Sequence, residues 1–320
     1  MTATQLKTTK LGQTGLEITR VGFGAWALGG GGWEFGWGPQ DDSESITAIE
    51  RALELGVNWI DTAAAYGFGR SEQIVGSALQ GVSDRPYVFT KCSLLEGPGR
   101  TVVHDLTRDS ILREATNSLE RLGIDAIDLY QIHWPNPAVD IEQGWAALVE
   151  LKAQGLVRHI GVSNFDVEQL RAIQQIAPVE TLQPQFSLIE RDVEAEILPF
   201  AEREGIGVIV YSPMGSGMLT GAMTRERIAA LPDDDWRKQG ARFTEPQLSA
   251  NLDLVDRLNT VAARHQTNAG SVAVAWTLGN PAVDGAIVGF RRPHQVDAIV
   301  AAANLELTER DLAEITGAAS

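Results

Sequence analysis

The chain has 320 residues, of which 44% are hydrophobic and 21% are charged. This is the composition of a globular protein with a large core, and it excludes a disordered tail, a collagen and a coiled coil. Lysine and arginine total 26 residues against 42 for aspartate and glutamate, so the formal net charge is −16. Such a surface repels phosphate backbones and anionic membranes, and we expect neither nucleic acid nor a membrane as a partner.

The cysteine content and the N-terminal segment concern the compartment. Cys92 is the single cysteine, which excludes an intramolecular disulfide and a cysteine-rich metal site. Residues 1–20 contain no apolar core of signal-peptide length. No window of the sequence approaches the roughly 18 consecutive apolar residues of a membrane-spanning helix. We therefore predict a cytoplasmic protein without a metal centre.

The predicted elements begin with a β-hairpin and continue as alternating strands and helices. Residues 6–10 and 16–18 flank a glycine-containing turn, which predicts a hairpin at the bottom of the fold. The runs of β-branched and aromatic residues that follow predict strands. They are residues 19–24, 59–61, 87–91, 126–133, 159–163, 181–184, 207–212 and 286–289. Apolar residues at the helical period predict helices at residues 43–55, 71–79, 106–122, 141–154, 167–175, 193–204, 249–265 and 270–278.

Helix ends and one long connection carry their own signals. Asp42 and Ser43 are predicted to cap the first helix and Asp166 the fifth. The glycines after the first and fourth helices, Gly56 and Gly155, suit the left-handed position that ends a helix. Residues 224–245 contain Pro232, an acidic run at 233–235 and few apolar positions, which predicts a mobile loop.

Eight strand–helix alternations predict a parallel sheet, either an open doubly wound sheet or a closed barrel. The polar residues at the C-terminal ends of the apolar strands decide between them, because a barrel gathers those ends at one mouth. They are Asp61, Lys91, His133, Ser163, Asn164 and Ser212. We therefore predict one α/β domain over residues 1–320. Its fold is a (β/α)8 TIM barrel with an N-terminal hairpin and a long loop after the seventh strand.

Four residues can form a proton-donating site. A partly buried Asp61 needs a cation such as Lys91 beside it. An ammonium group near the phenol of Tyr66 would lower its pKa from about 10 toward the working range. The nitrogen of His133 could hold a carbonyl oxygen against that phenol. Each residue alone has a structural interpretation, as a salt bridge, a packed loop aromatic or a core histidine, so the prediction depends on the four together.

These residues resemble the aldo-keto reductase superfamily over almost the full length. The matching segments are Gly56-Val-Asn-Trp-Ile-Asp61-Thr-Ala-Ala-Ala-Tyr66-Gly, Lys91, His133 after Tyr-Gln-Ile, Gly161-Val-Ser-Asn-Phe165, Tyr211-Ser-Pro-Met-Gly and Gly289-Phe-Arg-Arg-Pro-His-Gln295. The chain is more similar to the bacterial stress-protein and potassium-channel β-subunit-like branches than to the aldose reductases. The resemblance implies a barrel that reduces aldehydes and ketones with NADPH. It assigns the catalytic tetrad to Asp61, Tyr66, Lys91 and His133.

The resemblance also implies a cofactor cleft. Ser163 and Asn164 would bind the nicotinamide carboxamide with help from Gln183, and Tyr211 would stack on the ring. A glycine-rich stretch would hold the pyrophosphate with its N–H groups, although a flexible loop has the same composition. It consists of Ser212, Pro213, Met214, Gly215, Ser216 and Gly217. Under the ribose would lie Gly24, Ala25 and Trp26, which lack the third glycine of a Rossmann motif.

The choice of NADPH depends on an arginine. Arg291, at the start of a predicted helix in an acidic protein, suits a 2′-phosphate, with Gly289 and Gln295 beside it. The pattern departs from the aldose-reductase branch at Gly289 and Phe290, which replace a Lys-Ser pair, and at Ile299, where an asparagine is usual. Surface arginines that bind only water are the alternative.

Aromatic residues on the mouth loops predict the substrate pocket and a small carbonyl compound as the partner. The expected walls are Trp26, Trp33, Trp37, Tyr66 and Trp134. Such walls favour planar or apolar carbonyl compounds. Cys92 should point away from the mouth and be inert. Two other functions fit the sequence: an NADPH-binding regulatory or sensor protein with slow turnover, and a barrel lyase or isomerase using Asp61 and Lys91.

Overall fold

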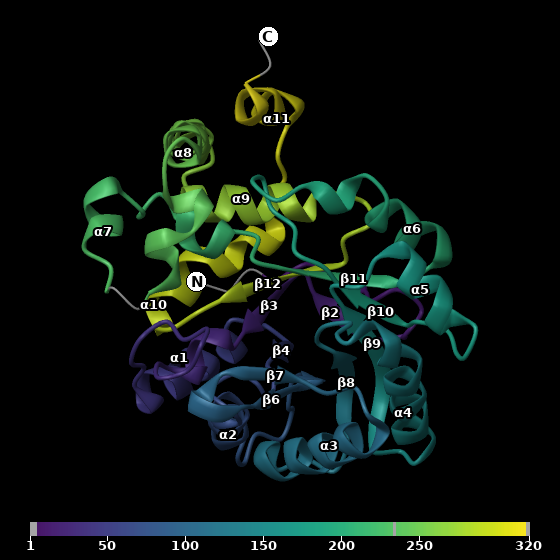
Figure 1. The fold of residues 1–320 in the computed structure, drawn as a ribbon. Coiled ribbons are helices and arrows are strands. Elements are labelled where there is room, and N and C mark those ends of the chain that lie inside the picture. The colour runs from purple at the N-terminus through teal and green to yellow at the C-terminus, as the bar shows by residue number, and fades with distance from the viewer. Residues whose placement is uncertain (1–4, 233–234, 318–320) are drawn as a thin grey trace.

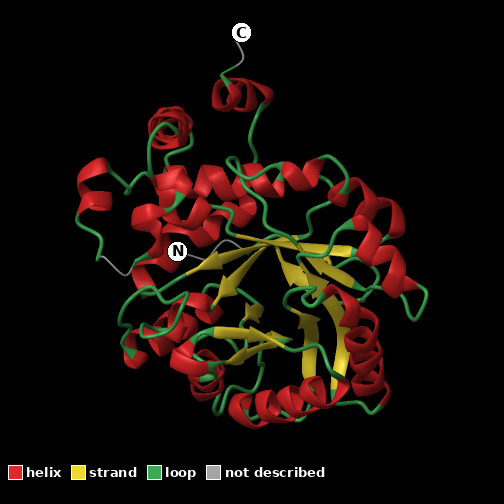
Figure 2. Ribbon diagram, in the orientation of Figure 1, coloured by secondary structure: helices red, strands yellow, loops and turns green. Residues whose placement is uncertain are grey.

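The computed structural model describes residues 5–232 and 235–317, and in these ranges eight parallel strands close into a barrel surrounded by helices (Figures 1 and 2). In chain order the barrel strands are β3 (Val21–Gly24), β4 (Trp59–Asp61), β5 (Tyr87–Cys92), β8 (Ile127–Ile132), β9 (Val157–Ser163), β10 (Thr181–Gln183), β11 (Gly207–Tyr211) and β12 (Gly285–Gly289). Each strand pairs with the next, and β12 pairs with β3 to close the ring. The predicted (β/α)8 barrel is confirmed.

The helices around the barrel match the predicted segments to within a few residues. They are α1 (Asp42–Glu54), α2 (Arg70–Ala78), α3 (Arg108–Leu122), α4 (Ile141–Ala153), α5 (Val167–Gln174), α6 (Ile197–Glu204), α8 (Gln247–Arg264) and α9 (Ala269–Leu278). Two further helices, α10 (Pro293–Ile299) and α11 (Glu309–Thr316), follow the last strand. Short 3-10 helices are η1 (Trp26–Gly29), η2 (Pro98–Arg100), η3 (Ala138–Asp140), η4 (Asp192–Glu194), η5 (Gly215–Thr220) and η8 (Val300–Asn304). Among the described residues, none of the helices combines the length and apolar character needed to cross a membrane.

The N-terminal hairpin covers the bottom of the barrel, as predicted. Its strands β1 (Thr8–Lys10) and β2 (Glu17–Thr19) pair antiparallel. Leu11 and Ile18 are fully buried in a cluster with residues from the barrel interior. Gly12, at φ +48°, lies so close to β11 that a Cβ atom there would be 2.3 Å from Gly207 N. The hairpin therefore closes the end of the barrel opposite the strand C-termini.

The helix ends agree with the predictions at all but one position. Asp41, rather than Asp42 or Ser43, caps α1, and its side chain accepts a hydrogen bond from the backbone of Glu44. The predicted cap is therefore wrong by one residue, because the extended residue that precedes the first turn is Asp41. Asp166 caps α5 as predicted. The expected left-handed glycines are also confirmed, with φ values of 91° at Gly56 and 77° at Gly155.

Residues 224–245 differ from the predicted loop. This segment contains α7 (Arg225–Ala229), η6 (Trp236–Gln239) and η7 (Ala241–Phe243), while residues 233 and 234 of the acidic run lie outside the described part. The apolar residues are few, but Ile228 and Phe243 are buried and order the segment.

A second hairpin, β6 (Leu94–Glu96) and β7 (Val102–His104), was not predicted. It lies in front of the barrel in Figure 1. The backbone N–H of Val102 donates a hydrogen bond to Glu34 Oε2 at 2.8 Å. The hairpin is therefore tied to the loop that follows β3.

Candidate active site

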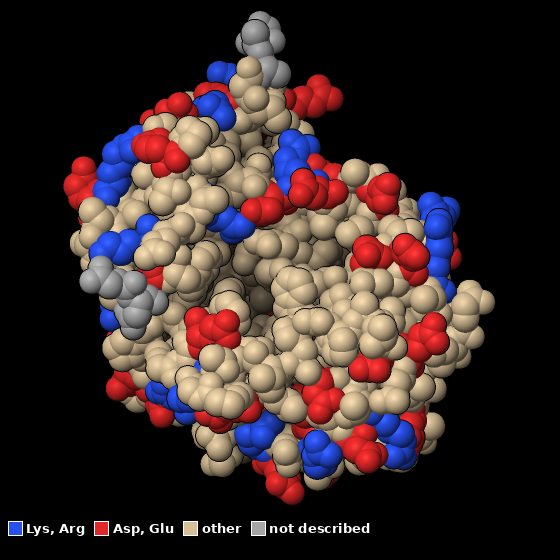
Figure 3. Space-filling view, viewed as in Figure 1, with Lys and Arg blue, Asp and Glu red and all other residues tan. Residues whose placement is uncertain are grey.

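The polar strand ends that predicted a mouth do meet at one end of the barrel. Figure 1 looks onto this end, and the space-filling view from the same side shows a hollow at its centre (Figure 3). The floor of the hollow is uncharged at the surface, and acidic and basic side chains lie around the rim.

A buried ion pair lies beneath this hollow. Asp61 ends β4 and Lys91 lies in β5, and Lys91 Nζ donates to Asp61 Oδ1 at 2.5 Å and to the carbonyl of Thr62 at 2.9 Å. The side chains of Lys91 and Asp61 are 0% and 3% exposed. Burial raises the pKa of the Asp61 carboxyl and lowers the pKa of Lys91, while each partner opposes the shift of the other. Two charges this deep persist because they compensate one another.

Tyr66 lies against that pair. Its Oη accepts a hydrogen bond from Lys91 Nζ at 3.2 Å, and its ring stacks on Trp26 with centroids 6.3 Å apart. Burial, followed by the negative charge of Asp61, raises the pKa of the Tyr66 phenol well above its ordinary value. The expectation that Lys91 brings this pKa toward neutrality is wrong for this structure, because burial and the Asp61 charge both raise it. The phenol is therefore held as a proton donor.

His133 completes the group. It follows β8, and its ring meets that of Tyr66 edge to face with centroids 5.6 Å apart. Burial and the charge of Lys91 lower the pKa of His133 well below its ordinary value, so the imidazole is neutral. Its Nδ1 is buried and has no hydrogen-bond partner within the described ranges. The structure thus brings together all four residues of the predicted tetrad.

The residues expected at the nicotinamide are linked to the tetrad. Asn164 Nδ2 donates to the carbonyl of His133 at 3.0 Å and to Ser163 Oγ at 3.0 Å, and Tyr211 Oη donates to Asn164 Oδ1 at 2.9 Å. Ser163 Oγ donates to the carbonyl of Gln183. The side-chain amide of Gln183 donates to Asp61 Oδ2 at 2.8 Å. Hydroxyl and amide groups therefore converge beside the proton-donating phenol.

The glycine-rich stretch follows β11 and leads into η5. Its backbone has positive φ values at Ser212 (56°), Gly215 (56°), Ser216 (57°) and Gly217 (93°). Left-handed residues in succession make concave backbone surfaces that suit anions. A Cβ atom on Gly217 would lie 4.0 Å from Arg237 Nη1, so a cation borders this surface. The donor set fits a phosphate-bearing cofactor. Pro213 and Met214 belong to the same turn.

Across the mouth, Gly24 ends β3 and the backbone N–H of Ala25 donates to the carbonyl of Asp61.

Arg291 lies where β12 ends at Gly289 and α10 begins. Its guanidinium donates to Gln40 Oε1 at 2.6 Å, to the carbonyl of Pro39 at 2.6 Å and to that of Trp37 at 3.4 Å. Gln295 Oε1 accepts from the backbone N–H of Arg291. Burial and two nearby arginines lower the pKa of Arg291. The structure therefore ties Arg291 to the loop after β3.

The predicted pocket walls lie at different depths. Trp26 and Trp37 contact each other at a centroid separation of 5.5 Å, and Arg237 lies over Trp37 at 4.6 Å. Trp33, in the same loop after β3, packs edge-on against Phe35 and against Phe68 of the loop after β4. Trp134, directly after the tetrad histidine, is 42% exposed. Cys92 is buried among apolar side chains, and burial raises the pKa of its thiol well above the ordinary value, as expected of an inert thiol.

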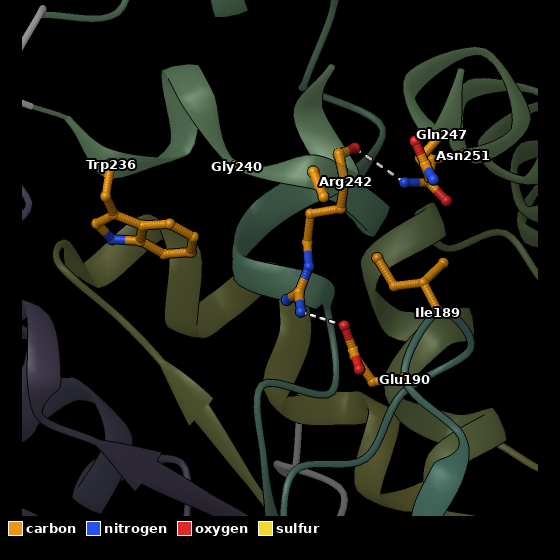
Figure 4. Close-up of a pocket in the computed structure, with 8 residues that line it drawn as sticks. Ile189, Glu190, Trp236, Gly240, Arg242, Gln247 and Asn251 are labelled. Carbon is orange, nitrogen blue, oxygen red and sulfur yellow. Dashed lines mark hydrogen bonds and ion pairs between the residues drawn. The ribbon is translucent and has the colours of Figure 1, made fainter. Parts of the chain in front are cut away.

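Several residues near the mouth were not identified from the sequence. Arg242 of η7 forms an ion pair with Glu190, which lies in the loop after β10 (Figure 4). The same two residues line a cavity of about 290 Å³. His104 of β7 lies near enough to His133 to lower its pKa. Arg242 is visible in the sequence as a charged residue in a segment with few apolar positions. Its ion pair with Glu190 could not be predicted, because the two residues are distant in sequence.

The chain is similar to known reductases. Residues 20–320 match the family model described as "Aldo/keto reductase family". Aldo-keto reductase YhdN of Bacillus subtilis is 38% identical over 310 residues, or 96% of this chain and 92% of that protein. The NADH-specific methylglyoxal reductase of Escherichia coli is 35% identical over 322 residues, which cover 96% of each chain. The solved structure of glycerol dehydrogenase AKR11B4 from Gluconobacter oxydans superposes with a TM-score of 0.87 at 34% identity, covering 99% of this chain and 95% of that one.

Proposed function

The chain belongs to the aldo/keto reductase family, and from this premise we propose that it reduces aldehydes or ketones to alcohols with NADPH. One observation carries the proposal. The Tyr66 hydroxyl lies 3.2 Å from Lys91 Nζ, whose second partner is the buried carboxylate of Asp61. A phenol backed by an ammonium–carboxylate pair is a proton donor whose conjugate base is stabilised as it forms.

Each residue has a distinct part in the proposed reaction. Burial keeps Tyr66 protonated, so it can donate to a carbonyl oxygen, and Lys91 stabilises the phenolate that results. Asp61 holds Lys91 in place and keeps it charged. The neutral imidazole of His133 orients the carbonyl oxygen toward the phenol. When bound, the nicotinamide supplies the hydride that the carbonyl carbon receives.

We assign the cofactor cleft to the residues expected from the sequence. The amide and hydroxyl groups of Ser163, Asn164 and Gln183 would hold the carboxamide, and the ring of Tyr211 would lie against the nicotinamide. The concave backbone from Ser212 to Gly217 would hold the pyrophosphate. Under the nicotinamide ribose would lie Gly24, Ala25 and Trp26.

The preference for NADPH depends on charge around Arg291. Arg237 and Arg292 both act on its pKa, so three guanidinium groups lie close together in a protein of net charge −16. Arg237 and Arg292 are ion-paired with Asp235 and Glu44, whereas Arg291 has no carboxylate partner among the ion pairs of the described residues, and its charge supports binding of a 2′-phosphate. A relative is named NADH-specific, so the preference must be measured directly.

The pocket walls indicate the substrate class. Trp26 stacks on Tyr66 next to the reacting hydroxyl, and Trp134 is an exposed aromatic side chain directly after His133. Such walls favour small planar carbonyl compounds, including aryl aldehydes and dicarbonyls.

Replacing the phenol tests the mechanism. Tyr66→Phe should lower kcat by at least about 1000-fold, because it removes the general acid. The Kd for NADPH should change less than about twofold. Turnover is measured by NADPH consumption with aliphatic aldehydes, aryl aldehydes, diketones and sugars. Tyr87→Phe, a half-buried tyrosine at the opposite end of the barrel, is the matched control. Near-normal rates in Tyr66→Phe would refute the mechanism. Tight NADPH binding without turnover by the unaltered protein would favour a regulatory or sensor role.

Replacing Arg291 tests the cofactor. Arg291→Ala should raise the Kd for NADPH by about tenfold, the value of one charge-assisted contact, and leave the Kd for NADH nearly unchanged. Arg203→Ala, an exposed arginine on α6, is the control. Equal weakening of both cofactors would mean that Arg291 only supports the loop after β3.

A further inference from the structure

A polar residue lies deep in the barrel with no part in the proposed chemistry. Gln131 is the last residue but one of β8 and is fully buried. In the barrel register it lies beside Lys91 of β5 on one side and Gly161 of β9 on the other. It therefore lies at the same height in the barrel as Lys91 of the tetrad, and most other residues of its strand are apolar.

Gln131 contacts a residue two strands away, across β9. The residue of β9 beside it, Gly161, leaves room for Thr181, since a Cβ atom on Gly161 would lie 2.0 Å from Thr181 Oγ1. Gln183 Nε2 lies 3.4 Å from Gln131 Oε1 and 2.8 Å from Asp61 Oδ2. A continuous series of polar contacts thus runs from Gln131 through Gln183 and Asp61 to the ion pair with Lys91.

The nitrogen of the Gln131 amide is buried without a partner. Its Nε2 is fully buried and has no hydrogen-bond partner of ordinary geometry in the part of the chain that the structure describes. The Gln131 side chain also lowers the pKa of Asp61, against the larger effect of burial. A buried N–H group without a partner is costly, so a glutamine at this position calls for a role.

We propose that Gln131 is a positioning residue, which orients the Gln183 amide and holds the Asp61 carboxylate in its ionised form beneath Lys91. The inference rests on the proposed function, since the ion pair acts through Tyr66. The Gln183 amide, held by Gln131, and the Lys91 ammonium then both donate to a carboxylate that is 3% exposed. Hydrogen bonds donated to a carboxylate favour its charged form, and removing one shifts the balance toward the protonated acid.

Other titratable groups near Asp61 define what a pH measurement reports. Lys91 of β5 and Tyr66 of the loop after β4 contact or face it directly, and His133 follows Gln131 by two residues. Glu72 of α2 raises the pKa of Lys91, and Tyr66 raises the pKa of Tyr211. His133 is held neutral. Loss of activity at acid pH therefore reports protonation of the Asp61–Lys91 pair.

The test compares the pH profile of the native protein with that of Gln131→Met, which has nearly the same length and no amide. With NADPH and 4-nitrobenzaldehyde, the acid limb of kcat/KM should move to higher pH by up to about one unit, because the Gln183 amide loses the acceptor that orients its hydrogen bond to Asp61. The Kd for NADPH should change less than about twofold. Thr181→Val is the matched control: it removes a buried hydroxyl without a partner in the described ranges, one strand beyond Gly161, and should leave the acid limb in place.

Further measurements distinguish a failure of the inference on Gln131 from a failure of the proposed function. Titration of the Asp61 carboxyl by carbon-13 NMR should give a higher pKa in Gln131→Met than in the native protein, whether or not turnover is observed. If Gln131→Met does not fold, Gln131→Asn, whose amide is one methylene too short, should shift the limb in the same direction. An unchanged acid limb and an unchanged Asp61 titration would overturn the inference. Absence of turnover in the native protein would refute the proposed function alone.

Discussion

Two carboxylates at opposite ends of the barrel have pKa shifts of opposite direction. At the mouth, Asp61 has donors in Lys91 and Gln183, and burial still raises its pKa. At the bottom, Glu180 accepts hydrogen bonds from His159 Nδ1 at 2.9 Å, Lys152 Nζ at 2.7 Å and the backbone of Ile160 at 3.0 Å. These partners lower the pKa of Glu180 to about 2.

The difference comes from access to water as much as from the partners. The side chain of Glu180 is 19% exposed, whereas that of Asp61 is 3% exposed. At the mouth every tetrad group is displaced toward its neutral form: the pKa values of Asp61 and Tyr66 are raised, and those of Lys91 and His133 are lowered. These shifts keep Tyr66 protonated as a donor and His133 neutral, whereas a firmly ionised carboxylate such as Glu180 contributes stability alone.

Removing the cation at the mouth should have the largest effect. Lys91→Met should lower kcat by about 1000-fold or more and destabilise the fold by about 3 kcal/mol, because the Asp61 charge is left unpaired in the interior. Urea unfolding and NADPH consumption measure the two effects. The double variant Lys91→Met/Asp61→Asn should regain much of the stability and none of the activity. Equal stability of the single and double variants would contradict the view that an unpaired charge is the cause.

Removing the charge at the bottom should affect stability but not turnover. The pKa of Glu180 is lowered from 4.5 to about 2, so its carboxylate stabilises the fold above pH 4.5, and this contribution is lost as the pH falls toward 2. Glu180→Gln should therefore cost about 2 kcal/mol at pH 7 and less at pH 3. Denaturant unfolding at both pH values measures it, with kcat within about twofold of normal. A loss that does not vary with pH would assign the effect to packing.

The barrel and the tetrad could be predicted because their signals are local. Asp61 and Lys91 stand at or next to the ends of apolar strands, and a parallel barrel brings such ends together. His133 follows its strand in the same way. The β6–β7 hairpin has no such periodicity, and it is fixed by a contact between Val102 and Glu34 across 68 residues.

The protonation behaviour of the site could not be predicted. An ammonium beside a phenol lowers its pKa in water, but the depth of Tyr66 reverses the sign, and depth is a property of the assembled barrel. Gln131 is visible in the sequence as a polar residue in an apolar strand. Its contact with Gln183 joins two strands that are separated by β9, and no local signal reveals such a contact. The hydrogen bonds of Arg291 could not be predicted either, because its guanidinium donates to the backbone and a side chain of the distant loop at residues 37–40.

The mildest change at the bottom of the barrel is Lys152→Met. The Lys152 side chain is 41% exposed, and ion pairs of this kind contribute below about 1 kcal/mol. Glu180 keeps its hydrogen bonds from His159 and the backbone of Ile160, so the carboxylate stays ionised and paired. The melting temperature of Lys152→Met at pH 7 should therefore fall less than half as far as that of Glu180→Gln. Equal falls would mean that Glu180 depends on this one cation, as Asp61 depends on Lys91, and the two ends of the barrel would then share one way of holding a carboxylate.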